Sequence, residues 1–386
     1  MKIQRKELKI MDKKIINVLE KLANKKIVKP GQRHFEYLDC SYEKDKEKKY
    51  KTIDGITYEC DEDGKLAIVV KCDTSKTGNV IIPEGVTKIL NDAFCNSKIE
   101  SVVFPSSLKT IYGVAFMGCK RLKSIDFGQG IVDIGNDYSG GVFQGCENLE
   151  KVVLPSQIKS IGHNTFFGCY KLTSIQLNDG LIKIGDGAFS ACYALKEITL
   201  PCTIDRIGKN ALSWLQKINV SEMPKNIVFA TTCSDFALEG MPSFVEISDI
   251  HNNITLLPKT FKDKTSQATI NTFINNGIRL RDVWDYAIHE NESFDLAVRD
   301  CIIKKTDGDI FPDSQKYIEA KEEKVLTYLV KNKRLDDILT LIRTKSLSLS
   351  KESIELLLNF SDDVSMNAYV LEEVRKAGLH TDTLMI

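Results

Sequence analysis

The sequence predicts an α+β protein of several domains, in which a β-solenoid with a β-hairpin cap is followed by an all-α helical-repeat domain. Two observations predict this class. Residues recur with a period of about 23 between Val86 and Val220, and beyond Thr265 the apolar residues change to helical spacing. A period in this range indicates a solenoid, because a single repeat cannot bury its own apolar face and must stack on its neighbours.

The period is carried by aliphatic and aromatic positions. Six isoleucines follow one another at spacings of 22, 23, 27, 23 and 23 residues: Ile89, Ile111, Ile134, Ile161, Ile184 and Ile207. Five phenylalanines keep the same order, and Leu212 takes the sixth place: Phe94, Phe116, Phe143, Phe166 and Phe189. Six copies in register predict six parallel strands, one from each coil.

One copy, residues 160–177, shows the expected local structure. It ends in the pattern L-x-x-I-x-L, and apolar residues two apart indicate a short strand with one buried face. Gly162 and its equivalents follow a second short run, where we expect a corner with positive φ. The pattern A-F-x-G-C comes next, and we expect it to form the opposite wall with its phenylalanines stacked in the interior.

The segments before the repeats predict a helix, a linker and a cap. Residues 7–23 have apolar side chains at helical spacing, which indicates an amphipathic helix. Residues 44–51 are a charged linker, and residues 53–70 alternate around the polar turn 61–64, which predicts a hairpin. We expect this hairpin to pair with the first repeat and to cover the open end of the solenoid.

The repeat register fades after Val220. Residues 227–230, 245–247 and 254–257 predict three further strands, and helices of 10 to 18 residues follow from Thr265. We therefore expect an N-terminal helix and charged linker at 1–50, a hairpin cap at 51–83, repeats at 84–221, distal strands and a linker at 222–262, and a helical (α-hairpin repeat) domain at 263–386.

The repeat resembles the BspA-like leucine-rich repeat family, whose copies have approximately the pattern I-G-x-x-A-F-x-G-C-x-x-L-x-x-I-x-L-P. The resemblance covers about residues 53–220, including the leading hairpin, and implies a leucine-rich-repeat β-solenoid without the asparagine ladder of other leucine-rich repeats. Many members of the family lie on cell surfaces, which implies a surface adhesin or carbohydrate-binding module as an alternative function. The helical region is weakly similar to ankyrin-type repeats but has no T-P-L-H signature.

Composition limits the location and the partners. The chain has no net charge, but residues 1–51 carry 16 Lys and Arg against 8 Asp and Glu, which favours either an acidic partner or a solvated helix and linker. The first residues do not form the apolar core of a secretory signal, and no window of 18 apolar residues predicts a membrane span. Four of the 11 cysteines occupy one repeat position, as buried free thiols would. These features predict a cytoplasmic protein.

The sequence contains no recognisable catalytic or metal-binding motif. The five histidines lie in five different segments, and none has a His or Cys neighbour at metal-ligand spacing. Residues 61–64 resemble the start of a calcium loop, but Cys72 stands where the loop needs a glutamate. The 14 basic and 12 acidic residues of 83–220 exclude a nucleic-acid footprint. We predict a non-enzymatic protein without cofactor or metal; only acidic residues gathered around His289 in a deep pocket would favour an enzyme.

The expected function is protein–protein interaction through the exposed side of the strands and the helical domain. Period-two alternation points two columns of side chains outward from the strands. The candidate binding residues are Val103, Ser124, Asp126, Lys151, Val153, Ser174, Gln176, Glu197 and Thr199. A mixed polar face with exposed valines fits a binding site, but it also fits a plain solvated sheet. The sequence identifies neither the protein partner nor the oligomeric state.

An insertion in the third copy provides a further candidate. Four additional residues lie between Asn136 and Gly141, and insertions of this kind map to one face of a solenoid. Tyr138 is either an aromatic side chain presented to a partner or part of a slack loop.

Overall fold

The structure is a computed structural model of the 386-residue chain. It describes residues 48–135, 140–221, 228–229, 242, 244–251, 254–258, 290–306, 312–347, 350–358, 367–368, 371–372 and 375–376. The chain divides into two units, Met1–Glu47 and Lys48–Ile386. The helix expected at 7–23 and the candidate Tyr138 both lie outside the described residues.

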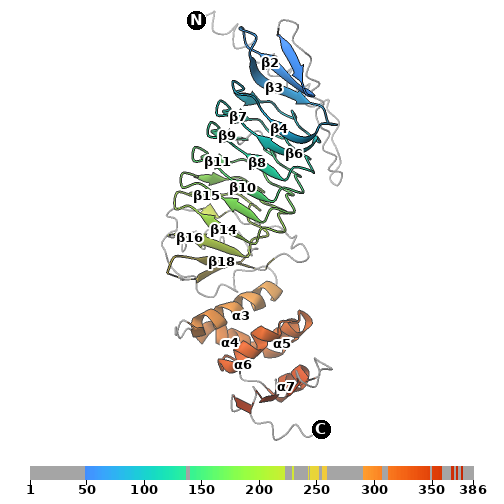
Figure 1. Cartoon of the computed structure of the whole chain (residues 1–386). Helices are drawn as coiled ribbons and strands as arrows, with labels where there is room; N and C mark the ends of the chain where they lie inside the picture. Colours follow the sequence, from blue (N-terminus) through green and yellow to red (C-terminus); the bar gives the residue numbers. More distant parts are fainter. Residues whose placement is uncertain are drawn as a thin grey trace, which may run out of the picture. The chain divides into compact units, whose positions relative to one another are not determined.

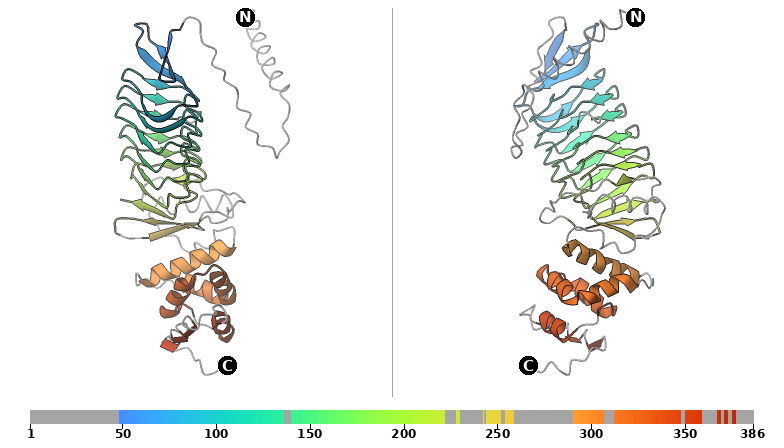
Figure 2. Two further views of the ribbon diagram at one scale, coloured as in Figure 1. Left: turned by 45° about the vertical axis from the view of Figure 1, so that its right-hand side comes forward. Right: turned by 180° about the vertical axis from the view of Figure 1, so that it is seen from behind.

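The repeats form a β-solenoid of about seven turns over residues 68–220 (Figures 1 and 2). One side of it is a ten-stranded sheet, which we call sheet A, in the order β1-β2-β3-β5-β7-β9-β11-β13-β15-β17. From β5 onward each strand has two residues: β5 (Lys88–Ile89), β7 (Thr110–Ile111), β9 (Asp133–Ile134), β11 (Ser160–Ile161), β13 (Lys183–Ile184), β15 (Arg206–Ile207) and β17 (Val228–Phe229). Neighbouring strands are parallel and in register, with isoleucine beside isoleucine from Ile89 to Ile207.

The L-x-x-I-x-L strands form a second side, and this side is not one continuous sheet. It consists of three ladders: β4-β6-β8, β10-β12 and β14-β16-β18-β19. The strands are β4 (Thr77–Ile81), β6 (Lys98–Val103), β8 (Ser124–Asp126), β10 (Lys151–Val153), β12 (Ser174–Gln176), β14 (Glu197–Leu200), β16 (Lys217–Val220), β18 (Phe244–Ser248) and β19 (Ile254–Pro258). The six predicted strands are therefore not joined in one ladder. The second short run of each copy carries the unbroken ladder of sheet A instead.

The A-F-x-G-C segments form the third side, with the predicted stack of phenylalanines inside it. Consecutive rings from Phe94 to Phe189 are stacked with centroids 4.7, 5.3, 5.6 and 5.7 Å apart. Backbone bonds join the same segments from coil to coil, such as the Phe116 N–H to the Val142 carbonyl (2.9 Å). Each coil thus buries its ring between two others, and the core is shared along the whole stack.

The corner glycines are required for two different reasons. Gly135 has the expected positive φ of 66°. Gly162, Gly185 and Gly208 do not; a Cβ atom on Gly162 would lie 2.5 Å from the carbonyl oxygen of Gly135 in the preceding coil. At these three corners the close approach of one coil to the next excludes a side chain, so the expectation of positive φ was wrong for them.

The predicted hairpin is present and continues sheet A beyond the first coil. β1 (Tyr50–Ile53), β2 (Ile56–Cys60) and β3 (Leu66–Cys72) are antiparallel, and β3 pairs in parallel with β5. Cys60 lies opposite Leu66, and Cys72 lies opposite Ile56. Both thiols are free. The hairpin extends only sheet A, and β4 remains the first strand of the other side.

The predicted distal strands are β17, β18 and β19, and the parallel pairing continues one coil beyond the point where the sequence register fades. β17 pairs with β15, β18 pairs with β16, and β19 then turns back antiparallel. The described part of the helical region contains α3 (Glu290–Thr306), α4 (Pro312–Ala320), α5 (Glu322–Lys331), α6 (Leu335–Arg343) and α7 (Lys351–Leu358). Three of these have 8 or 9 residues, which is shorter than the expected 10 to 18.

Candidate protein-binding surfaces

The predicted binding residues lie on the outer side of β6 to β14. Backbone pairing sets Val103 beside Asp126, Lys151 beside Ser174, and Val153 beside Gln176. These side chains are exposed, as are those of Ser124, Glu197 and Thr199, whereas the residues between them in each strand face the core. The sequence therefore placed them on one side of the solenoid, although the backbone ladder is interrupted between β8 and β10 and between β12 and β14.

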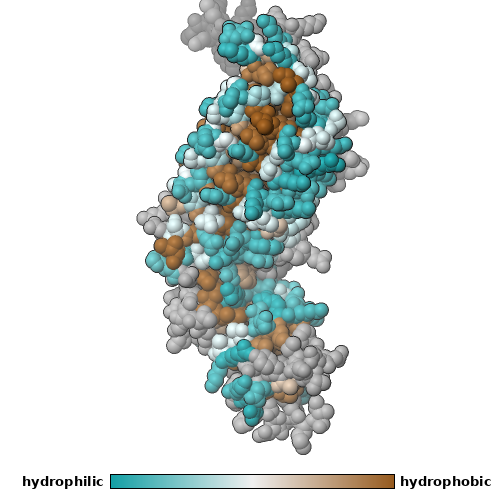
Figure 3. Space-filling view, in the orientation of Figure 1, coloured by the Kyte–Doolittle hydropathy of each residue, from teal (hydrophilic) through white to brown (hydrophobic). Residues whose placement is uncertain are grey.

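Two valines are the apolar part of this surface. Val153 is 58% exposed and Val103 is 37% exposed, amid serine, threonine and charged side chains. The space-filling view shows hydrophobic residues running along the solenoid between hydrophilic flanks (Figure 3). Exposed apolar side chains in a regular array can be buried by a partner without rearrangement of the fold.

Two ion pairs join adjacent coils next to this surface. Lys120 lies 2.8 Å from Glu147, and Lys123 lies 3.6 Å from Glu100. Hydrogen bonding to Glu147 raises the pKa of Lys120. Exposed pairs of this kind add little stability, and they leave the surface without a strong field of one sign.

An aromatic row, which the sequence analysis missed, lies along the turn that follows the third side. Tyr170 and Tyr193 stack with centroids 5.3 Å apart and planes 4° from parallel, and Trp214 meets Tyr193 edge-on at 4.5 Å. The tyrosines occupy the position after the repeated cysteine, where earlier copies have Lys120 and Glu147. Comparing that one position across the copies would have revealed the row. Its two tyrosines remain exposed, and tyrosine is a residue type enriched in protein interfaces.

The repeated cysteines are structural hydrogen-bond donors. Each thiol donates to the carbonyl oxygen of the phenylalanine in the preceding coil, as from Cys119 to Phe94 at 3.0 Å and from Cys192 to Phe166 at 3.1 Å. Burial raises the pKa of the Cys192 thiol to about 12 and that of Cys169 well above its usual value. The Cys169 and Cys192 thiols therefore stay protonated near neutral pH, where a thiol is a poor nucleophile. The expectation that they are only small apolar fillers missed this bonding.

The remaining candidates for chemistry have structural explanations. His163 is half-buried, and its Nδ1 accepts a hydrogen bond from the Asp186 N–H (3.0 Å) in the next coil. Asp61 closes the hairpin turn by accepting from the Lys65 N–H (2.8 Å), which confirms a polar turn. Among the residues that the structure describes, no group of three His, Cys, Asp or Glu side chains could hold a metal ion. His289 lies outside the described residues.

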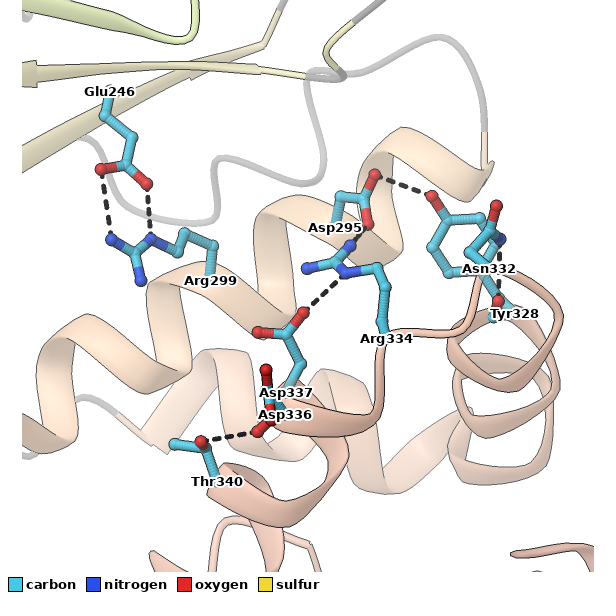
Figure 4. Close-up of polar contacts among 9 residues, drawn as sticks. All are labelled: Glu246, Asp295, Arg299, Tyr328, Asn332, Arg334, Asp336, Asp337 and Thr340. Atoms are coloured by element: carbon cyan, nitrogen blue, oxygen red, sulfur yellow. Dashed lines mark hydrogen bonds and ion pairs between the residues drawn. The ribbon is translucent and has the colours of Figure 1, made fainter. Parts of the chain in front are cut away.

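Charged side chains connect the solenoid to the first helix and the helices to one another (Figure 4). Arg299 of α3 donates to both carboxylate oxygens of Glu246 on β18, at 2.5 and 3.2 Å. Asp295, also on α3, is buried and accepts from the Tyr328 hydroxyl (2.8 Å) and from Arg334. Burial, with a contribution from the Asp295 carboxylate, raises the pKa of Tyr328. Burial opposes the charge on Arg334, but Asp295 and Asp337 outweigh it and raise the pKa of Arg334.

A pocket lies between α3 and α5. It is lined by residues that include Glu290, Phe294, Lys324 and Tyr328. Glu290 accepts hydrogen bonds from Lys321 (3.1 Å) and Lys324 (3.4 Å), and the bond from Lys321 is the main cause of its lowered pKa. The acid is therefore engaged by two lysines at the rim.

The chain belongs to the BspA-type leucine-rich repeat family, whose model matches six copies over residues 72–138 and 136–268, about half of the chain. It is similar to a leucine-rich repeat protein of T. pallidum (23% identity, covering 45% of this chain and 86% of that chain, TM-score 0.36). It is also similar to a leucine-rich cell surface protein of Faecalibacterium prausnitzii (22% identity, 54% and 60% covered, TM-score 0.36). The pneumococcal vaccine antigen PcpA shares 21% identity, with 55% and 54% covered and a TM-score of 0.36. No curated protein matches. Among the described helices, none has the length and apolar character needed to cross a bilayer.

Proposed function

We propose that this chain is a non-enzymatic scaffold that binds a protein partner on the outward face of β6 to β14. The observation that carries this function is the pair of exposed valines, Val103 and Val153, held in a regular polar array by strands whose other face is core. Burying two such valines would contribute about 3 kcal/mol of apolar transfer free energy, while the surrounding serine and threonine hydroxyls supply hydrogen bonds. Binding requires no rearrangement of the backbone, because the strands already hold these side chains in a regular arrangement.

We also propose that the protein acts in the cytoplasm and that the helical region, residues 263–386, contributes a second recognition surface. The free buried thiols of the solenoid support a reducing compartment. The alternative of a carbohydrate-binding adhesin has less support at the aromatic row. Sugar recognition by an aromatic ring uses an open ring face, whereas Tyr170 and Tyr193 cover one face of each other.

The test is a matched pair of double variants. Val103→Glu with Val153→Glu places two charges on the outward strand face and should remove partners in quantitative affinity capture by the full chain from a lysate of its native host. Val132→Glu with Ile182→Glu is the control, because these residues are also exposed but lie next to β9 and β13 on sheet A. Equal capture by both double variants would show that the outward face is not the binding surface.

A further inference from the structure

The two sides of the solenoid begin differently at the N-terminal end. Sheet A continues past the first coil through β2 and β1, whereas the opposite side begins at β4, which pairs only with β6 among the described strands. β3 and β4 belong to the same coil, so the hairpin projects two strands, or roughly 10 Å, beyond the level of β4. The result is a step with the edge of β4 as its floor and the hairpin as its wall (Figure 1).

The edge of β4 offers unpaired backbone groups. In a strand, consecutive residues direct their N–H and C=O groups to opposite sides. Ile82 donates to the Val103 carbonyl (3.0 Å), so Val80 and Ile82 face β6, and Asn79 and Ile81 direct their backbone groups to the open side. Those outward groups have no partner in the described chain. Solvent satisfies them in the free protein, and an added strand would satisfy them in a complex.

Exposed apolar side chains lie beside this edge. Ile81 is 75% exposed and lies next to Val103 on the outward face. On the wall, Ile53 is 50% exposed and lies opposite Ile56, which places it on the face of the hairpin that buries Ile56 and Tyr58 in the core. A strand added to β4 would therefore find an apolar side chain on each of its faces.

The step is held in place and is free of strand-blocking charges. Lys76 pairs with Asp54, and the Asp73 N–H donates to the Gly55 carbonyl (2.8 Å), so the hairpin turn is tied to the segment that leads into β4. Residues 77–81 contain no lysine, glutamate or proline, the residues that usually protect an edge strand from pairing. The distal end of the same side differs, because β19 closes it antiparallel and α3 lies against β18 and β19.

We propose that β4 is a β-augmentation site that takes an extended segment of a partner protein with apolar residues on both faces. A second copy of this chain fits less well. Antiparallel pairing of two β4 strands across a two-fold axis would bring the projecting hairpin of each copy into the space of the other, because the sheets extend only about 5 Å per strand. An isolated extended segment fills the step without that collision. This site uses the main chain of β4, so it stands apart from the outward face proposed above.

The first test is amide exchange in the full chain. We expect the Val80 and Ile82 amides, which bond to β6, to be protected at least 100-fold more strongly than those of Asn79 and Ile81. Equal protection of the four amides would mean that the edge is already covered, and the proposal would be wrong.

The second test uses a fluorescein-labelled peptide with the sequence of residues 98–104, which includes β6. We chose this sequence because β6 already pairs with the other side of β4. Fluorescence anisotropy should show binding to the full chain, with new protection at Asn79 and Ile81. Ile81→Lys should weaken binding at least tenfold, and Ile182→Lys, at an exposed position beside β13 inside the unbroken sheet A, should leave it unchanged. A peptide with proline at the position of Val102 should not bind.

Three results would overturn the proposal: no binding of the peptide, equal binding to Ile81→Lys, or protection that appears away from β4. Sedimentation of the protein without peptide tests whether a second copy occupies the edge. A dimer that dissociates in the Ile81→Lys variant would assign the edge of β4 to a second copy of this chain. Loss of capture by the Val103/Val153 variant together with peptide binding to the wild type would leave both proposed surfaces in place, whereas the same loss of capture without peptide binding to the wild type would remove only this one.

Discussion

The coils of the solenoid are joined by the same few contacts repeated from one coil to the next, whereas α3 to α7 pack through apolar side chains and through polar contacts that follow no repeat. Phe116 stacks on Phe94 and on Phe143, and each cysteine thiol of the third side bonds one coil back. In the helical region, Asp295 binds Tyr328 and Arg334, which are 33 and 39 residues away. The solenoid therefore spreads its stability over equivalent contacts, whereas the helical region combines apolar packing with polar contacts that have no equivalent elsewhere in it.

The largest effect should come from removing one ring of the stack. Phe143→Ala should lower the free energy of unfolding by about 3–5 kcal/mol, because a fully buried ring between two others leaves a cavity that the flanking coils cannot fill. Urea unfolding followed by circular dichroism measures the change.

The control for this prediction is Phe167→Ala in the next coil, where the phenylalanine is exposed at 37%. Its loss should be about 1–2 kcal/mol and clearly smaller than at Phe143, since more than a third of Phe167 stays in water on folding. Equal losses for the two variants would mean that the stacked row does not hold the coils together.

The corresponding weak point of the helical region is Arg334. Arg334→Met should destabilise α3 to α6 by about 3 kcal/mol, because it removes the cation that pairs with the buried Asp295 carboxylate. Hydrogen exchange of the helical amides should increase, while the amides of the solenoid strands keep their protection.

Arg375→Met is the matched change at an exposed pair, since Arg375 lies 3.1 Å from Glu372 with its side chain mostly in solvent. A loss below about 0.5 kcal/mol is expected there. Equal losses of stability in the two arginine variants would mean that the contacts of Asp295 with Tyr328 and Arg334 contribute no more than an exposed ion pair. The contrast between the two regions would then disappear.

The same difference explains how much of the molecule could be predicted from its sequence. The spacing of Phe94 to Phe189 predicted the stacked interior because each coil repeats the same contact. The sequence did not reveal which strands would carry the unbroken ladder, because the strands of sheet A from β5 onward are only two residues long, too short for period-two alternation to show. The sequence also did not reveal that β17 pairs with β15 and that β18 pairs with β16. These pairings depend on backbone hydrogen bonds beyond the point where the side-chain pattern ends.

The candidate site was predictable only in part, for a related reason. Alternation along each strand identified the outward residues, Val103 and Val153 among them. The open edge of β4 depends on where the hairpin stops extending one sheet and leaves the other, and no local pattern in residues 77–81 encodes that. The Asp295 cluster likewise joins residues from three helices whose separation in the chain follows no period.

The smallest predicted loss of stability comes from a cysteine variant. It tests whether the repeated thiols contribute as hydrogen-bond donors. Cys169 is fully buried, and its thiol donates to the Phe143 carbonyl (3.3 Å). Cys169→Ala should cost about 1–2 kcal/mol at pH 7, from a lost hydrogen bond and a small cavity, whereas Cys202→Ala at an exposed position should cost almost nothing.

The pH dependence separates the thiol from its volume. Burial raises the pKa of Cys169 in the folded chain, so the stability that it contributes is complete below the unfolded pKa near 8.5 and falls as the pH rises above it. Each pH unit beyond that point removes about 1.4 kcal/mol per thiol from the wild type, but nothing from Cys169→Ala at this position. The stability difference between the two proteins should therefore shrink from pH 8 to pH 10. A stability difference that stayed constant over that range would mean that the Cys169 thiol ionises as easily in the folded chain as in the unfolded one. The Cys169 thiol would then not be held protonated as a hydrogen-bond donor.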